Sequence, residues 1–255
     1  MISNITTLIA VSFTGGQHFA DKCVLTQVDI PLLIQHMDKQ DGQADTYLVK
    51  EENSQFSRLK YPKRRYEWLG GRIAAKYAAI QLSSPTSTEL TQNQWQSLKI
   101  SQNNHGKPSL SSSHNLQNLP YISISHSDGV AVGLASYYHC GVDIQEITAA
   151  LERVEKRFVT QAEKDLLSNH SQAKVKRSDL GVIWSAKEAI KKASALQPLP
   201  GFLEISLQDI RRENGYQLEM LFKREKNKIK LHHRVFAIIY DKFSLALTFN
   251  ERDQC

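Results

Sequence analysis

The feature that most constrains the fold is a pair of short apolar segments joined by a tight turn in the middle of the chain. Residues 121–125 alternate between apolar and polar side chains, residues 127–129 read Ser-Asp-Gly, and residues 130–136 form a second apolar segment. This pattern predicts an antiparallel β-hairpin. Further strands are predicted at residues 8–13, 24–28, 141–144, 218–222, 235–240 and 245–249, and near Ile205.

Helices are predicted between these strands. Residues 62–82 are the clearest case, because apolar residues recur at helical spacing from Trp68 to Ile80 and Pro62 suits the first helical position. Residues 103–119 are rich in Asn, Gly, Pro and Ser and are expected to be mostly loop. With further helices predicted from Pro31, at 161–167 and at 178–196, the order of elements indicates an α+β protein with mostly antiparallel sheets.

Composition is that of an ordinary globular protein. The chain has 255 residues, 41% hydrophobic and 23% charged, which is enough for a real core. No apolar stretch is long enough for a membrane helix, and the first residues lack the basic segment of a signal peptide. The three cysteines are too widely spaced for a zinc site or a disulfide framework. We therefore expect a cytoplasmic protein that does not contact a membrane.

The formal net charge of +6 favours acidic partners. Basic residues cluster at residues 58–65 and 223–234, where the simplest interpretation is a solvated face or hairpin tip. A nucleic-acid-binding protein is one alternative that this charge leaves open. It is disfavoured because the chain has no recognisable nucleic-acid-binding motif and few aromatic residues among its basic clusters.

Two helical segments resemble each other. The segments that begin at Trp68 and Trp184 each carry a charged residue four positions later and a lysine eight positions later, which forms one helical stripe. Chance similarity between amphipathic helices is one explanation. The other is two similar α/β subdomains related by a pseudo-twofold axis, with a ligand cleft between them. We expect subdomains at residues 1–130 and 131–255.

Familiar catalytic motifs are absent from the sequence. It contains no Walker-type phosphate loop, no GxGxxG, no GxSxG and no HExxH. The neighbours Ser125 and His126 are a poor nucleophile and base, because adjacent side chains of a strand point to opposite faces.

Two carboxylates stand out because they occur in segments that are otherwise apolar. Asp143 lies in a short apolar strand and Glu188 lies between apolar residues of a predicted helix. A buried carboxylate is costly unless it is paired or bound to a cation, and two converging carboxylates suit a hard cation such as Mg²⁺. The alternative is a structural acid paired with lysine, such as Glu188 with Lys192.

Five segments together resemble the surfactin-type 4′-phosphopantetheinyl transferases. Three of them are GVDIQEI at residues 141–147, RFVTQAE at 157–163 and WSAKEAIKK at 184–192. Upstream, Gly106-Lys107-Pro108 and the segment ISHS at 124–127 match two more family motifs in the same order. The segment RRYEWLGGRIAAKYAA is similar to a helix of the enterobactin-associated members, so that the resemblance covers roughly residues 58–210.

This resemblance implies a specific reaction. Family members transfer the phosphopantetheine arm of coenzyme A to a serine of an acyl or peptidyl carrier protein and release adenosine 3′,5′-bisphosphate. Their fold has two similar α/β subdomains with coenzyme A in the cleft. The resemblance therefore implies a Mg²⁺-dependent enzyme with coenzyme A as cosubstrate and an acidic carrier protein as partner, acting as a monomer without nucleic acid.

Residue roles follow from the same motifs. Asp143 and Glu188 are expected to bind Mg²⁺, and Lys192 to neutralise the pyrophosphate. Glu163 matches an acid proposed as the general base. Contacts to coenzyme A are expected from Lys107, Pro108, Ser125 and His126, and contacts to its 3′-phosphate from Arg64, Arg65 and Arg72.

One position departs from the family pattern. Many relatives have an acid two residues after the aspartate, where this chain has Gln145. An amide oxygen can bind Mg²⁺ but brings no charge, so we expect Gln145 or a water molecule to fill that position. The departure also leaves open a non-catalytic relative that binds coenzyme A or a carrier protein.

Overall fold

The structure is a computed structural model that describes residues 6–8, 23–39, 44–83, 90–113, 118–212 and 215–250. It confirms the α+β class with antiparallel sheets. The described chain divides into two compact units, the first reaching Tyr138 and the second beginning at His139. The predicted boundary at residue 130 was eight residues too early, because the strand Val130–Ser136 pairs within the first unit.

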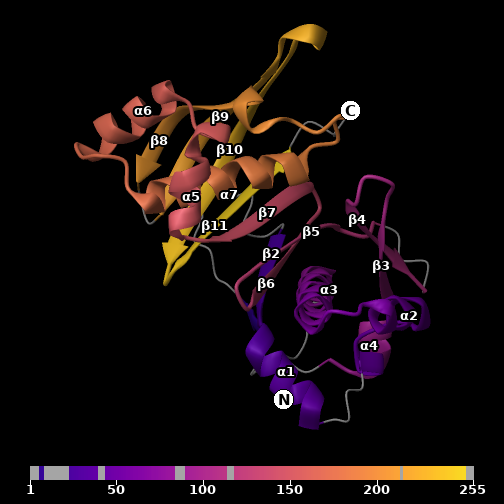
Figure 1. Cartoon of the computed structure of the whole chain (residues 1–255). Coiled ribbons are helices and arrows are strands. Elements are labelled where there is room, and N and C mark those ends of the chain that lie inside the picture. Colours follow the sequence, from indigo (N-terminus) through magenta and orange to yellow (C-terminus); the bar gives the residue numbers. More distant parts are fainter. Residues whose placement is uncertain are drawn as a thin grey trace. The chain divides into compact units, whose positions relative to one another are not determined.

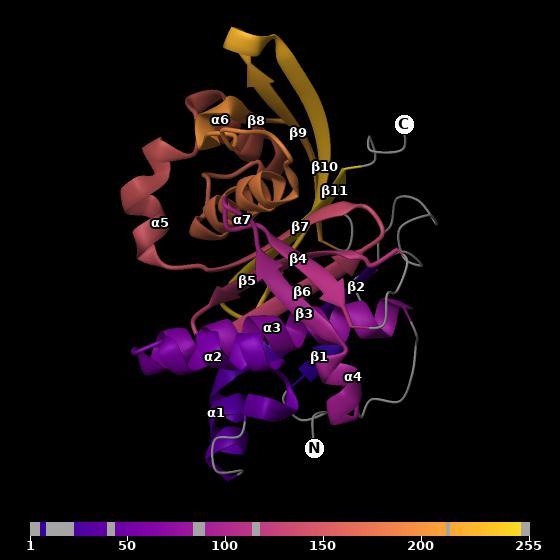
Figure 2. The ribbon, with the colours of Figure 1, turned by 90° about the vertical axis from the view of Figure 1, so that its right-hand side faces the viewer.

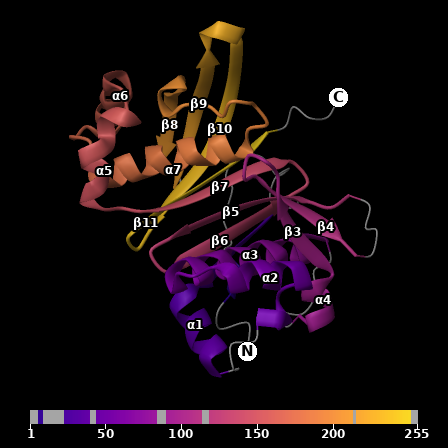
Figure 3. The same cartoon turned by 45° about the vertical axis from the view of Figure 1, so that its right-hand side comes forward.

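The first unit is built on a four-stranded antiparallel sheet in the order β1-β2-β6-β5, with a separate two-stranded sheet of β3 and β4. The long helix α3 packs along β6, β2 and β5 (Figure 3). Its elements are β1 (Thr6–Leu8), β2 (Cys23–Asp29), α1 (Ile30–Lys39), η3 (Ala44–Thr46), α2 (Lys50–Arg58), α3 (Pro62–Ser83), α4 (Gln92–Gln96), β3 (Leu98–Gln102), β4 (Pro108–Ser112), β5 (Tyr121–Ser127) and β6 (Val130–Ser136).

The predicted central hairpin is β5 and β6. Asp128 and Gly129 connect the strands with φ angles of +36° and +83°, the left-handed conformation that suits a tight hairpin turn. The predicted helix over 62–82 is α3, which is buried on nearly all sides from Leu69 onward. The expectation of mostly loop over 103–119 was wrong at Pro108–Ser112, because β3 pairs with this segment along its whole length.

The second unit is a five-stranded antiparallel sheet in the order β7-β11-β10-β9-β8. Helix α7 lies along β7, β11 and β10 (Figure 1). Strands β9 and β10 continue past the end of β11 as a long hairpin (Figure 2). The elements are β7 (His139–Glu146), α5 (Ala149–Val154), η4 (Glu155–Arg157), α6 (Gln161–Ser171), α7 (Arg177–Ala193), η5 (Phe202–Glu204), β8 (Ile205–Arg212), β9 (Tyr216–Arg224), η6 (Glu225–Asn227), β10 (Ile229–Tyr240) and β11 (Phe243–Asn250).

Each unit has its own core. In the second unit α7 contributes Val182, Ile183, Ala186, Ala189 and Ile190, which pack with apolar residues of β8, β9, β10 and β11. In the first unit, apolar residues of α3 pack against α1, α2 and β6. Of the strand predicted at 8–13, only Leu8 is described, as the last residue of β1; residues 9–13 lie outside the described residues. Among the helices that the structure describes, none is long and apolar enough to span a membrane.

Candidate functional site

Helix α7 and strand β7 are in direct backbone contact at Gly141. A Cβ atom at this position would lie 1.9 Å from the carbonyl oxygen of Ala189 and 2.7 Å from the amide nitrogen of Ala193. Only glycine allows this approach, which explains the glycine two residues before Asp143. Side chains alternate along a strand, so Asp143 and Gln145 share the face of Gly141, toward α7.

Asp143 is paired across this contact with Lys192. Lys192 Nζ donates to Asp143 Oδ1 at 2.7 Å, and the Asp143 side chain is only 9% exposed. Strand β7 is an edge strand of the sheet in the described chain. Glu188 and Lys192 are four residues apart on α7, so they share one helical stripe, and the contact of Lys192 shows that this stripe faces β7.

Two contacts between α7 and the sheet indicate where Glu188 lies relative to Asp143 of β7. Ala189 and Ala193 lie against Gly141, and Ser185 Oγ lies 2.7 Å from the hydroxyl of Ser244, the partner of Gln145 in the sheet. Glu188 therefore falls between these two contacts. Its Oε1 accepts a hydrogen bond of 2.7 Å from Lys191, not from Lys192 as the sequence alternative had it.

The side-chain oxygen atoms of these residues are of the kind that binds magnesium. Asp143, Glu188 and Gln145 offer oxygen ligands, which Mg²⁺ prefers, and the buried Asp143 requires a cationic partner. No group of three His, Cys, Asp or Glu side chains converges in the part of the chain that the structure describes. Two carboxylates match the usual Mg²⁺ site, which is completed by substrate phosphates and water. The amide nitrogen of Gln145 donates to the carbonyl oxygen of Glu146 at 2.8 Å.

The first unit has a pocket of about 190 Å³ that contains several of the predicted coenzyme A contacts. The pocket lies between the first half of α3, the β3–β4 hairpin and β5. Its lining includes four of the predicted residues, Arg64, Arg72, Pro108 and His126, together with Glu67, Trp68, Ile100, Gln102, Gly106 and Ile124.

Arg72 is the buried cation of this pocket. Its guanidinium carbon lies 3.3 Å from the ring centroid of Trp68, and its Nε, 3.7 Å from Glu52 Oε1, has no hydrogen-bond partner among the described residues. Burial lowers the pKa of Arg72 to about 10 against the opposing effect of Glu52, so the group is still cationic at neutral pH. A cationic guanidinium in the lining of a pocket can bind an anion.

Strand alternation separates the two neighbours on β5. His126 lines the pocket, with Nδ1 at 3.8 Å from Glu67 Oε2, whereas the buried Ser125 does not line it. Lys107 and Arg65 are likewise not part of the lining, and Arg65 lies instead over the ring of Phe56 at 4.5 Å. The sequence reasoning missed Glu67 and Trp68, although both lie one to two turns from Arg72 on the same helix.

Glu163 is enclosed in a buried network. It is 1% exposed and forms the capping box of α6, where its Oε2 accepts from the amide and hydroxyl groups of Thr160 at 2.8 and 2.9 Å. Its Oε1 accepts from the amide of Leu207 at 2.9 Å and lies 2.8 Å from Lys187 Nζ. Lys187 also donates to the carbonyl of Phe158 at 2.7 Å, and burial lowers its pKa against the opposing effect of Glu163. This enclosure favours a structural role for Glu163, which joins the start of α6 to β8 and α7.

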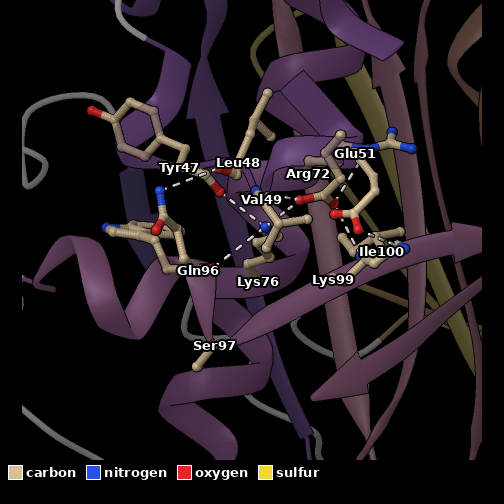
Figure 4. A network of polar contacts seen from close by, with 12 residues as sticks. Tyr47, Leu48, Val49, Glu51, Arg72, Lys76, Gln96, Ser97, Lys99 and Ile100 are labelled. Carbon is tan, nitrogen blue, oxygen red and sulfur yellow. Dashed lines mark hydrogen bonds and ion pairs between the residues drawn. The ribbon is translucent and has the colours of Figure 1, made fainter. Parts of the chain in front are cut away.

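The first unit contains the same network, which the sequence reasoning missed. Lys76 of α3 donates to the carbonyl of Tyr47 at 2.9 Å (Figure 4) and to Glu52 Oε2 at 2.6 Å. Glu52 completes the start of α2 by accepting from Val49, and it accepts from the amide of Ile100 at 3.0 Å. The signal available in the sequence was the spacing, since Glu and Lys are 24 residues apart in both networks.

These two networks correct the internal similarity found in the sequence. When the two sequences are aligned through these networks, Lys76 corresponds to Lys187. The alignment of Trp68 with Trp184 had instead paired Lys76 with Lys192. Tyr47 and Phe158, the carbonyl partners of the two lysines, each precede the network glutamate by five residues. The feature that is repeated in the two units is therefore the buried ion pair, Lys76 with Glu52 and Lys187 with Glu163. At this alignment Glu188 corresponds to Tyr77, so the first unit has no carboxylate at the position of Glu188.

Parts of the chain are similar to a protein family and to known proteins. Residues 139–248 match the family model of the 4′-phosphopantetheinyl transferase superfamily. Enterobactin synthase component D of Escherichia coli O157:H7 is 29% identical over 178 residues, which cover 68% of this chain and 73% of that protein, and the protein from strain K12 is 27% identical over the same length. A holo-(acyl-carrier-protein) synthase from Bacillus anthracis, solved in complex with CoA (3′,5′-ADP), has 23% identity and a TM-score of 0.38, covering 45% of this chain and 92% of that one.

Proposed function

We propose, from the match of residues 139–248 to the family model of the 4′-phosphopantetheinyl transferase superfamily, that the chain transfers the 4′-phosphopantetheine arm of coenzyme A to a serine of an acyl or peptidyl carrier protein. The other product is adenosine 3′,5′-bisphosphate. The observation that carries the proposal is the contact at Gly141, which brings Asp143 and Lys192 together beside Glu188 within the matched region.

Asp143 and Glu188 would hold Mg²⁺, with Gln145 as a neutral oxygen ligand. A bound Mg²⁺ would supply charge stabilisation to the diphosphate as its bond breaks. Lys192 would add a second positive charge, which favours departure of the anionic leaving group. Arg72, Arg64 and His126 of the first unit would bind the 3′-phosphate. A pocket of about 190 Å³ is smaller than the usual range for a whole ligand, so we assign only this end of coenzyme A to it.

The carrier serine must lose its proton as it attacks phosphorus. We assign no side chain to this step, because the acid predicted for it, Glu163, is engaged by Thr160, Leu207 and Lys187. We expect the partner to be acidic, since the chain is basic overall. The wide spacing of Cys23, Cys140 and Cys255 along the sequence is typical of a protein of the reducing cytoplasm, and we take the working form to be a monomer.

The direct test is mass spectrometry of purified apo-carrier proteins incubated with the full chain, coenzyme A and Mg²⁺. We expect the carrier to gain the mass of the phosphopantetheine arm at its serine, and chelation of the metal to stop the reaction. A chain that binds coenzyme A but modifies no carrier with or without Mg²⁺ would instead be the non-catalytic relative.

Replacement of Arg64 tests the pocket. We expect Arg64→Ala to raise the KM for coenzyme A about 10-fold, which corresponds to the loss of about 1.4 kcal/mol from one phosphate contact. With dephospho-coenzyme A, which lacks the 3′-phosphate, the wild type and the variant should have the same KM. Arg58→Ala, an exposed arginine at the end of α2, is the matched control and should have no effect. An equal loss with both cosubstrates would contradict the assignment.

Replacement of Gln145 tests the departure from the family pattern. We expect Gln145→Ala to raise the Mg²⁺ concentration needed for half-maximal rate with little change in the maximal rate, because a neutral ligand is replaced by water. Gln145→Glu should lower that concentration, since a third carboxylate adds charge to the site. Titration of the initial rate with Mg²⁺ measures both. Complete loss of activity in Gln145→Ala at saturating Mg²⁺ would show that the amide has another role.

A further inference from the structure

Lys191 is a charged residue within the segment at residues 184–192, and none of the roles given above falls to it. Its Nζ donates to Glu188 Oε1 at 2.7 Å and lies 4.2 Å from the ring centroid of Phe202. The side chains of Lys191 and Glu188 are 21% and 23% exposed, so water screens this pair less than a surface pair. The ammonium is therefore held between a carboxylate and an aromatic face.

Phe202 is itself fixed in place. Its ring lies 4.8 Å from Trp184 and 6.3 Å from Phe158, measured between centroids, so helix α7 supplies both the lysine and part of the support for the ring. The connection between α7 and η5 is also clamped by Arg224, which donates to the carbonyls of Pro198 and Leu199 at 2.9 and 3.1 Å. Arg224 further pairs with Glu204, two residues after Phe202, at 2.8 Å. A cation on this ring is consequently in a defined position.

A fixed ammonium on Glu188 affects any other cation that uses the same carboxylate. The ammonium occupies one of the two oxygens, and its charge repels a second cation. A diphosphate changes this balance, because it offers the ammonium a stronger anionic partner nearby and contributes oxygens to the metal.

We propose that Lys191, seated on Phe202, competes with the divalent cation for Glu188 and so makes metal binding depend on the diphosphate of the cosubstrate. This inference rests on the function proposed above and deepens it. Lys191 is a positioning residue in this scheme, because it acts through Glu188. It differs in this from Lys192, which pairs with Asp143.

Calorimetric titration of the full chain with Mg²⁺ tests the proposal without turnover, because no carrier protein is present. We expect Lys191→Met to lower the Kd for Mg²⁺ about 5- to 10-fold in the absence of coenzyme A. Lys191→Arg keeps the charge and should leave the Kd near that of the wild type. Lys174→Met removes an exposed lysine outside the site and is the matched charge control. Addition of coenzyme A should tighten Mg²⁺ binding more in the wild type than in Lys191→Met.

Phe202 provides a second, independent arm of the experiment. Phe202→Leu removes the aromatic face and should lower the Kd for Mg²⁺ about 2-fold, whereas Phe202→Tyr keeps the face and should behave as the wild type. An unchanged or weaker Kd in Lys191→Met would overturn the proposal, even if the wild type modifies carrier proteins normally. Absence of both Mg²⁺ binding and carrier modification in the wild type would instead overturn the proposed function, and the role of Lys191 with it.

Discussion

Asp143→Ala is expected to reduce the rate of carrier modification at least about 1000-fold. The carboxylate is the most buried acidic group of the proposed metal site, and its loss would remove a charged metal ligand and the partner of Lys192 together. Several kcal/mol of transition-state stabilisation correspond to this factor, since each 1.36 kcal/mol changes a rate tenfold. Initial rates by mass spectrometry at saturating coenzyme A and Mg²⁺ measure the effect.

The same strand offers a matched control. Glu146 is three residues further along β7 and pairs with Lys242 at 3.1 Å, so Glu146→Ala removes a carboxylate from β7 without touching the proposed site. We expect its rate to stay within about 2-fold of the wild type, as for other surface substitutions. Asp143→Asn keeps the shape of the side chain and should be as inactive as Asp143→Ala. An active Asp143→Asn would remove the metal assignment.

Lys187→Met is expected to lower the free energy of unfolding by about 3–5 kcal/mol, because it leaves the carboxylate of Glu163 buried without its cation. Urea unfolding followed by circular dichroism measures this value. Lys164→Met breaks the more exposed pair with Glu155 in the same unit and should cost less than about 1 kcal/mol. A similar cost for both variants would mean that the buried pair contributes no more than a surface pair.

Glu163→Gln separates stability from catalysis. The amide keeps an acceptor for Thr160 or Leu207 but cannot take a proton, so a general base would be lost entirely. We expect Glu163→Gln to be less stable and yet to retain most of kcat at a temperature where it is folded. The double variant with Lys187→Met should lose less stability than the sum of the single variants, because the two side chains are in contact. An inactive but folded Glu163→Gln would restore the assignment of Glu163 as the base.

The local elements could be predicted from the sequence because their signals are local. The turn at Asp128-Gly129 and the helical spacing of residues 62–82 depend on neighbours in the chain and were confirmed. Strand β4 was missed because its partner β3, and not its own composition, makes it a strand.

The site could be predicted only in part, because many of its contacts join residues that are far apart in the sequence. The resemblance to family motifs indicated Asp143, Glu188 and Lys192, and the contact between Lys192 and Asp143 brings two of them together. The lysine partners of Glu52 and Glu163 lie 24 residues along the chain and their strand-amide partners lie further away, and the position of Phe202 beside Lys191 depends on an irregular connection. No local pattern encodes such contacts.

The close approach at Gly141 affects which substitutions can alter the proposed site. Because the main chains of strand and helix pack directly against each other there, no intervening side chain sets the distance between the acid on the strand and the charges on the helix, and substitution of surrounding residues has little means of changing it. The first unit uses the same device at Gly133, where a Cβ would lie 2.3 Å from the amide nitrogen of Ala75. Substitutions on the outer surface can therefore change how a partner is selected, while the interior distances of the proposed site stay constant.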